Sequence, residues 1–242
     1  MIFAKGEEKM MLECHEIAYA ETDFDTKFGV PRQSGRVEAL TARIVFLPKY
    51  RNPDALRGIE GFSHLWLLWH FSENKSEDTF RPTVRPPRLG GNRMEGVFAT
   101  RSPYRPNPIG LSCVKLLRVE HTENEGDVLV VSGADLVNGT PILDIKPYLP
   151  HVDSHPEAVG GFATAFAGYA LSVSCDEALL APLPKEKREA LLAVLKEDPR
   201  PAYQDDSARI YGFVFAGFEV KFTVDGNVLT VVDIVANEKN RK

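Results

Sequence analysis

The first 155 residues contain no alternation of strand-like segments with long helix-like segments. Apolar runs with a strand-like pattern lie at residues 12–21, 36–47, 64–71, 110–120 and 127–137, and turns rich in glycine, proline or polar residues separate them. A doubly wound α/β fold needs a helix after nearly every strand. The pattern therefore argues against that class and favours a mostly β domain, either a sheet or a barrel.

The chain changes character after residue 155. Residues 151–168 are rich in small residues and glycine, as in a linker. Beyond them we predict a strand at 169–174, a helix within 183–198 that stops before Pro199, and a hairpin of two strands, 210–224 and 228–235, around an Asp-Gly-Asn turn. This order of elements predicts a small α+β domain over residues 165–242.

Composition favours a cytoplasmic protein. The three cysteines of the 242-residue chain stand far apart, without a CxxC pair, which suits a reducing compartment. No segment approaches the roughly 18 uninterrupted apolar residues of a membrane helix. The N-terminal residues are charged from Lys5 onward and lack the apolar core of a signal peptide. We expect no membrane association.

A local basic stretch stands out in a chain whose net charge is −5. Between Thr79 and Gly110 there is one acidic residue, Glu95, and six arginines: Arg81, Arg85, Arg88, Arg93, Arg101 and Arg105. Arginine suits bidentate contacts with phosphate. The stretch predicts a selective phosphate-bearing partner, with a solvated loop as the alternative.

Several familiar site motifs are missing. The sequence has no GxxxxGK[ST], no GxGxxG after a strand and no GxSxG, so it offers no P-loop, dinucleotide fingerprint or serine-hydrolase elbow. His151, Asp153 and His155 are spaced as metal ligands could be, but a polar loop before Pro156 is the simpler interpretation. We expect no metal.

Three polar stretches rich in glycine and proline remain: FGVPRQSG (28–35), FATRSPYRPNPIGLS (98–112) and DLVNGTPILDIKPYLPHVD (135–153). Each alone is compatible with ordinary turn chemistry. Together they can present backbone and side-chain hydrogen-bonding groups at fixed angles, which suits a nucleoside-sized ligand.

The same stretches carry a resemblance to a known family. With GIEGFSHLWLLWHF (58–71), RPTVRPPRLGGN (81–92) and DPRPAY (198–203), they resemble the TrmO family of tRNA methyltransferases, also called TsaA-like or YaeB-like. The resemblance implies a single-sheet β-barrel catalytic domain over residues 1–160. It further implies a homodimer with its sites near the subunit interface, and transfer of a methyl group from S-adenosylmethionine to N6 of threonylcarbamoyladenosine at tRNA position 37.

The resemblance also assigns residues to the cofactor. They are Gln33, Ser34, Gly35, Ser72, Glu73, Arg101, Leu111, Asn138, Gly139 and Thr140. Two of them depart from the family pattern, because many relatives have histidine at the position of Ser72 and aspartate at that of Asn138. Both replacements keep hydrogen-bonding groups, so they question single contacts rather than the activity.

For the reaction itself we expect Asp144 or Tyr148 to take the N6 proton, unless solvent suffices. Phosphates of the anticodon stem or the threonylcarbamoyl carboxylate are expected on basic side chains, and loop bases on aromatic ones. The tRNA-binding candidates are Arg85, Arg88, Arg93, Tyr104, Arg105 and Lys146.

Two rival interpretations stay open. The chain could be a non-catalytic module that binds S-adenosylmethionine or tRNA without turnover. It could also be a metal-dependent hydrolase built on His151, Asp153 and His155 together with Asp144.

Overall fold

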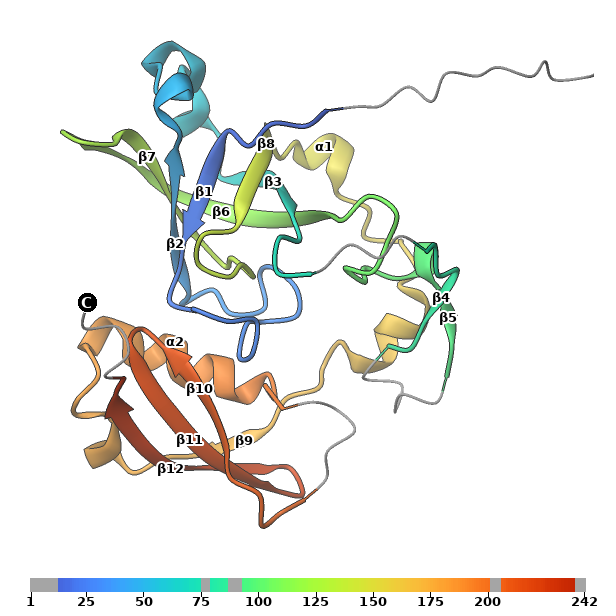
Figure 1. Ribbon diagram of the computed structural model, residues 1–242, viewed down its shortest axis with the longest axis vertical. Coiled ribbons are helices and arrows are strands. Elements are labelled where there is room, and N and C mark those ends of the chain that lie inside the picture. Colours follow the sequence, from blue (N-terminus) through green and yellow to red (C-terminus); the bar gives the residue numbers. More distant parts are fainter. Residues whose placement is uncertain (1–12, 75–78, 87–92, 201–205, 238–242) are drawn as a thin grey trace, which may run out of the picture.

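The computed structural model describes residues 13–74, 79–86, 93–200 and 206–237, which form a β-barrel and a smaller α+β unit beside it (Figure 1). The barrel strands are β1 (Ala18–Glu21), β2 (Thr41–Phe46), β3 (His64–His70), β6 (Ile109–Thr122), β7 (Gly126–Ser132) and β8 (Pro141–Pro147). They are ordered β1-β2-β7-β6-β3-β8, and β8 pairs with β1 to close the ring. The predicted mostly β architecture is confirmed.

Strand β3 shows how the barrel core is built. Its burial alternates strictly, with Leu65, Leu67 and Trp69 pointing inward and 0, 0 and 9% exposed. From the sequence alone, the continuous apolar run at 64–71 is consistent with a strand that is buried on both faces. The structure contradicts this expectation, because only one face of β3 is buried. The outward side chains of Trp66 and Leu68 are only half-buried, because a closed sheet has one dry interior.

Short elements fill the connections. The 3₁₀ turns η1 (Pro48–Tyr50), η2 (Pro53–Leu56) and η3 (Ile59–Gly61) lie between β2 and β3, and the Asn52 side chain caps η2 by accepting from the Asp54 N–H. Within the basic stretch, β4 (Thr83–Val84) pairs with β5 (Glu95–Gly96), followed by η5 (Val97–Ala99). The short helix α1 (Pro150–Asp153) follows β8, and η6 (Gly161–Phe166) lies farther along the linker.

The smaller unit contains β9 (Ser172–Ser174), η7 (Glu177–Leu180), α2 (Lys185–Lys196), β10 (Tyr211–Phe215), β11 (Phe218–Asp225) and β12 (Val228–Ala236). The sheet order is β10-β11-β12-β9. Residues 210–224, predicted as one strand, are two strands joined at Ala216 and Gly217. Both of these residues have positive φ, 50° and 80°, as a tight two-residue hairpin turn requires.

In the part of the chain that the structure describes, no helix is long and apolar enough to cross a membrane.

Candidate functional site

A gap opens in the barrel wall where β6 and β7 part. Their pairing ends at Lys115 and Ser132, while β6 continues alone beside β3 as far as Ile109. The turn Gln33–Gly35, hereafter the 33–35 turn, fills this gap. The Cys113 N–H donates to Ser34 Oγ at 3.0 Å, and the Gly35 N–H donates to the Gly133 carbonyl at 2.8 Å.

Glycines allow this close approach. Gly35 and Gly133 have φ of 75° and 77°, in the left-handed region where side chains cost energy. A Cβ on Gly133 would lie 3.2 Å from the Gly35 backbone. On β6, a Cβ on Gly110 would lie 2.2 Å from Trp69 Cε2, so this glycine makes room for the indole.

The three polar stretches singled out in the sequence meet at the gap. Arg101 Nη1 donates to Gln33 Oε1 at 2.6 Å, which links residues 98–112 to residues 28–35. Asp135, from the third stretch, accepts a hydrogen bond from the Ser34 backbone and feels the positive charge of Arg101. The structure therefore brings together four of the expected cofactor residues: Gln33, Ser34, Gly35 and Arg101.

Asp135 is the central residue that the sequence analysis did not identify. Its Oδ1 accepts from Ser112 Oγ at 2.5 Å, and Ser112 Oγ in turn accepts from Trp69 Nε1 at 2.9 Å. Burial raises the pKa of the Asp135 carboxyl to about 6, although the hydrogen bonds and Arg101 act in the opposite direction. A signal was present in the sequence: Ser112 occupies an inward position between Gly110 and Val114, where an apolar residue would be usual.

A second group of candidates lies on the outer surface of the barrel, next to the gap. Leu111, Leu68 and Asp144 are cross-strand neighbours on β6, β3 and β8. Leu111 is 47% exposed. Asp144 Oδ2 pairs with Lys146 Nζ at 2.9 Å, and its Oδ1 accepts from the Ile145 N–H at 2.9 Å. A half-exposed carboxylate thus stands in the same row as an exposed apolar side chain.

Tyr148 packs beside this row. Its ring centroid lies 5.7 Å from that of Trp66 and 6.1 Å from that of His64. Trp66 Nε1 donates to Asp153 Oδ2 at 3.1 Å, and the Leu149 N–H donates to the same oxygen at 2.8 Å. Both hydrogen bonds lower the pKa of Asp153, and the one from the Leu149 backbone has the larger effect.

His151, Asp153 and His155 do not form the ligand set that a metal-dependent hydrolase would need. Asp153 is already engaged as an acceptor by two N–H groups, and His155 Nδ1 lies 3.5 Å from Glu157. Among the described residues, no three His, Cys, Asp or Glu side chains are grouped as metal ligands.

The other expected cofactor residues lie in the turns that follow β3 and precede β8. Ser72 and Glu73 are in the first, where the Ser72 N–H donates to the His70 carbonyl. In the second, Asn138 Oδ1 accepts from the Thr22 N–H at 3.1 Å, and the buried Thr140 hydroxyl donates to the Val137 carbonyl at 2.7 Å. Gly139 has φ of 80°. The Asn138 contact ties this turn to the residue after β1, and the Thr140 contact closes the turn itself.

The basic stretch lies beside the gap on the β4–β5 ribbon and the loop after it. Arg85 is exposed, Arg93 pairs with Glu95 at 2.6 Å with 64% of its side chain exposed, and Arg105 donates to the Thr100 carbonyl. Tyr104 is 52% exposed. Arg88 lies outside the described residues.

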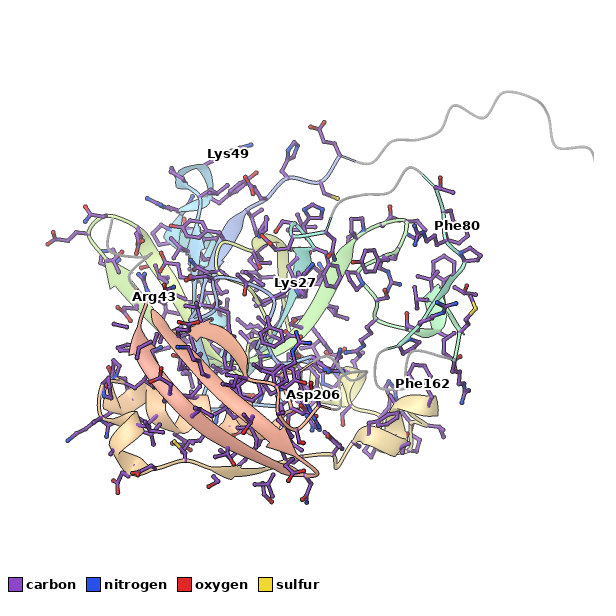
Figure 2. All side chains as sticks on the ribbon, turned by 60° about the horizontal axis from the view of Figure 1, so that its bottom comes forward. Lys27, Arg43, Lys49, Phe80, Phe162 and Asp206 are labelled. Carbon is purple, nitrogen blue, oxygen red and sulfur yellow. The ribbon has the colours of Figure 1, made fainter. Side chains whose placement is uncertain are left out.

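An aromatic pair accompanies these arginines. The rings of Phe80 and Phe98 are stacked, with centroids 6.1 Å apart and planes at 25°. Their exposed fractions, 56 and 72%, are high for phenylalanine. Phe80 stands at the outer edge of the molecule (Figure 2). Neither phenylalanine is among the residues predicted from the sequence to bind tRNA.

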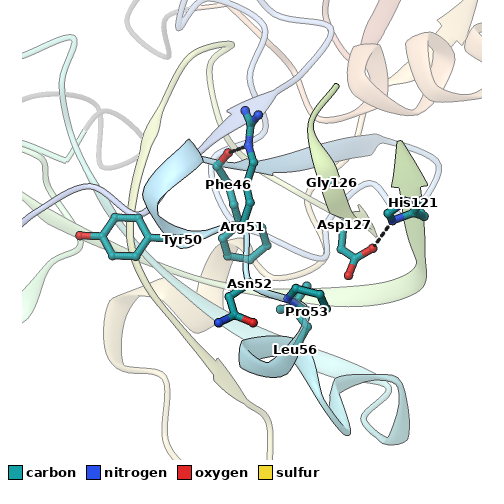
Figure 3. Close-up of a pocket in the computed structure, with 9 residues that line it drawn as sticks. All are labelled: Phe46, Tyr50, Arg51, Asn52, Pro53, Leu56, His121, Gly126 and Asp127. Carbon is teal, nitrogen blue, oxygen red and sulfur yellow. Dashed lines mark hydrogen bonds and ion pairs between the residues drawn. The ribbon is translucent and has the colours of Figure 1, made fainter. Parts of the chain in front are cut away.

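A small cavity of about 90 Å³ lies elsewhere (Figure 3). Its lining comes from the end of β2, from η1 and η2, and from the turn between β6 and β7, where His121 Nδ1 lies 2.8 Å from Asp127 Oδ1. The β6–β7 ladder runs from this turn to the gap at Lys115 and Ser132, so the cavity and the candidate site occupy opposite ends of one ladder.

Comparison with known proteins identifies the family. The family model of the tRNA-methyltransferase O N-terminal domain matches residues 19–154, and that of the TrmO C-terminal domain matches residues 170–237. A tRNA (adenine(37)-N6)-methyltransferase of Escherichia coli is 42% identical over 86% of this chain and 92% of the relative. One from Eikenella corrodens is 47% identical over 73% of this chain and 99% of the relative.

Solved structures agree with this result. A crystal structure of TrmO from Pseudomonas aeruginosa has 30% sequence identity and a TM-score of 0.74, covering 94% of this chain and all of the other. With both family domains matched in order, the chain belongs to the TrmO family.

Proposed function

We propose that this chain is an S-adenosylmethionine-dependent tRNA methyltransferase that acts on N6 of the adenosine at position 37, in its threonylcarbamoyl-modified form. The observation that carries the proposal is the meeting of Arg101, the 33–35 turn and the buried Asp135 at the gap between β6 and β7. Its support comes from membership of the TrmO family and from relatives named tRNA (adenine(37)-N6)-methyltransferase.

The residues at the gap fit S-adenosylmethionine. The exposed guanidinium of Arg101 suits the carboxylate of the methionine part, and its bond to Gln33 fixes its direction. The exposed Leu111 offers an apolar surface to a base. The backbone and hydroxyl of Ser34 are fixed by Asp135 and by β6. We assign Ser72, Glu73, Asn138, Gly139 and Thr140 to the rim of the same site.

S-adenosylmethionine supplies a methyl group that is already activated on a sulfonium. The main task of the protein is therefore to align the acceptor nitrogen with that group. Asp144 is the first candidate to accept the N6 proton, since Lys146 and the Ile145 N–H hold its two oxygens in place. Tyr148 is the second, but its ring packs on Trp66.

The tRNA is proposed to lie along the basic stretch. Arg85, Arg93 and Arg105 face its phosphates or the threonylcarbamoyl carboxylate, with Arg88 as a further candidate. Tyr104 and the stacked Phe80 and Phe98 offer exposed rings to unpaired loop bases. Lys146 is paired with Asp144, so its first role is to hold that carboxylate.

We further propose that the protein works as a homodimer with its sites near the subunit interface. Support comes from the outer face of β6, where Ile109 and Leu111 are 41 and 47% exposed beside the gap. Sedimentation equilibrium is expected to give twice the 26.9 kDa mass of one chain. A single-chain mass at micromolar concentration would contradict the dimer.

The decisive experiment is mass spectrometry of nucleosides from threonylcarbamoylated tRNA after incubation with the protein and S-adenosylmethionine. We expect one added methyl group on threonylcarbamoyladenosine, and none when the tRNA lacks that modification. Binding of both ligands without methyl transfer would instead identify a non-catalytic module.

A further inference from the structure

Residues 22–40 connect β1 to β2, yet their apolar side chains lie in the core of the C-terminal unit. Phe24, Val37 and Leu40 are at most 3% exposed and are clustered with the buried residues of α2 and β10–β12. The Phe24 ring meets Phe215 edge-on, with centroids 5.4 Å apart. Figure 1 shows this segment passing from the barrel to the C-terminal unit. The C-terminal unit is therefore completed by a segment of the barrel domain.

The packing is tight along the same segment. Gly29 has φ of 95°, and a Cβ there would lie 2.4 Å from Phe213 Cδ2, well inside contact distance. Phe28 also meets Phe213, with centroids 6.2 Å apart. Backbone and aromatic ring are thus pressed together, which leaves this part of the segment little freedom to move.

Charged contacts fix both flanks of the 33–35 turn. On its C-terminal side, the Arg36 guanidinium forks onto the Glu197 carboxylate, with Nε–Oε2 at 2.9 Å and Nη2–Oε1 at 3.0 Å. Arg36 Nη1 also donates to the Ala167 carbonyl at 2.6 Å. On the N-terminal side, Arg32 Nη2 donates to the Arg200 carbonyl at 3.2 Å.

The turn itself faces the barrel, because Ser34, Gly35 and Gln33 contact Cys113, Gly133 and Arg101. We infer that the C-terminal domain positions the cofactor site, and that Arg36 with Glu197 is the positioning pair. A forked arginine–carboxylate contact fixes direction as well as distance. Arg36 follows Gly35 directly, so movement of its guanidinium is passed to the turn.

This inference rests on the proposed function, which assigns the 33–35 turn to S-adenosylmethionine. It distinguishes this pair from other ion pairs of the C-terminal unit. Lys221 Nζ on β11 pairs with Asp233 Oδ2 on β12 at 3.2 Å, within the C-terminal sheet. The Lys221 pair is the control, because its loss removes an ion pair from the same unit without touching the 33–35 turn. Lys187 is unsuitable as a control, since its partner Asp23 lies between Thr22 and Phe24, which hold Asn138 at the rim of the proposed site.

The experiment compares Arg36→Ala, Arg36→Lys, Glu197→Gln and Lys221→Ala in the full chain. Calorimetry measures the dissociation constant of S-adenosylmethionine, steady-state kinetics measure its KM and kcat, and thermal melts report stability. We expect Arg36→Ala and Glu197→Gln to raise the dissociation constant and KM roughly tenfold, as for loss of a charged hydrogen bond. Arg36→Lys should fall between wild type and Arg36→Ala, and Lys221→Ala should bind as wild type does.

Lower melting temperatures with unchanged affinity for S-adenosylmethionine would overturn the inference, since the pair would then be purely structural. Equal losses of affinity for Lys221→Ala and Glu197→Gln would overturn it as well. If wild-type protein transfers no methyl group to tRNA, it is the proposed function that fails, and the calorimetric comparison still decides whether the pair positions the site.

Discussion

The Ser112 hydroxyl donates a 2.5 Å hydrogen bond to the Asp135 carboxylate across the gap between β6 and β7. Ser112 also accepts from Trp69 inside the barrel, while Asp135 accepts from the Ser34 backbone on the outside. The three contacts form one chain from the barrel core to the 33–35 turn. The protonation state of Asp135 therefore bears on both folding and ligand binding.

The first prediction concerns stability against pH. The pKa of Asp135 is about 6 in the folded protein and near 3.8 without burial, so between pH 4 and 6 the unfolded chain releases a proton that the folded chain keeps. The contribution of Asp135 to the free energy of unfolding must therefore fall by at most about 3 kcal/mol as pH rises through that window. Above the window it stays level. Urea unfolding of wild type and Asp135→Asn at pH 4 and 7 measures the difference. Parallel pH dependence in the two proteins contradicts the assignment.

The second prediction concerns the cofactor. The charged carboxylate accepts from the Ser34 backbone and attracts Arg101, and protonation weakens both effects. Affinity for S-adenosylmethionine should fall as pH drops below about 6, and Asp135→Asn should remove most of that dependence. Calorimetry at pH 5.5 and 7.5 tests this. Asp127→Asn, at the far end of the β6–β7 ladder, is the control and should behave as wild type does.

Arg101 supplies the third prediction. Arg101→Ala removes the group assigned to the ligand carboxylate and should weaken S-adenosylmethionine binding by tenfold or more, as expected for a charged hydrogen bond. Arg118→Ala is a suitable control, because Arg118 is an exposed arginine on β6 paired with Glu120. Equal affinities of the Arg101 and Arg118 variants would remove Arg101 from the site.

The fourth prediction separates phosphate contacts from other effects. Arg85→Ala and Arg93→Ala should each weaken tRNA binding and reduce the slope of log affinity against log salt by about 0.7–0.9, since each phosphate contact releases counterions. Arg57→Ala should leave the slope unchanged, because Arg57 is an exposed arginine that directly follows η2, outside the basic stretch, and pairs with Asp54. Filter binding from 50 to 200 mM salt provides the measurement, and unchanged slopes for Arg85 and Arg93 would count against the surface.

The fifth prediction tests the aromatic pair. Phe98→Ala should weaken tRNA binding by about 1–3 kcal/mol if a base stacks on the ring, with the salt slope unchanged. Phe98→Tyr keeps the ring and should bind nearly as wild type does. Phe62, which is 37% exposed and follows η3, gives a matched Phe→Ala control. A loss of affinity equal to that of the Phe62 variant would argue against stacking.

Much of the fold follows from local signals in the sequence. The strands β6 and β7 and the Asp-Gly-Asn turn between β11 and β12 appear as predicted, although β7 ends at Ser132 rather than at Val137. The hairpin of β10 and β11 was missed because Ala216 adopts a positive φ that alanine rarely takes. Nothing in the sequence marked that position as a turn except the following glycine.

The candidate site likewise has features that local sequence predicts and features that only tertiary contacts determine. Glycine, proline and arginine fixed which stretches would form rigid polar loops, because backbone restriction and charge are properties of single residues and their neighbours. Only the tertiary structure brought Cys113 to Ser34 and Arg36 to Glu197, over 79 and 161 positions of the chain. Those contacts depend on where β6 and β7 part and on which core takes up Phe24. Barrel closure and packing of distant segments decide both, and no local pattern encodes them.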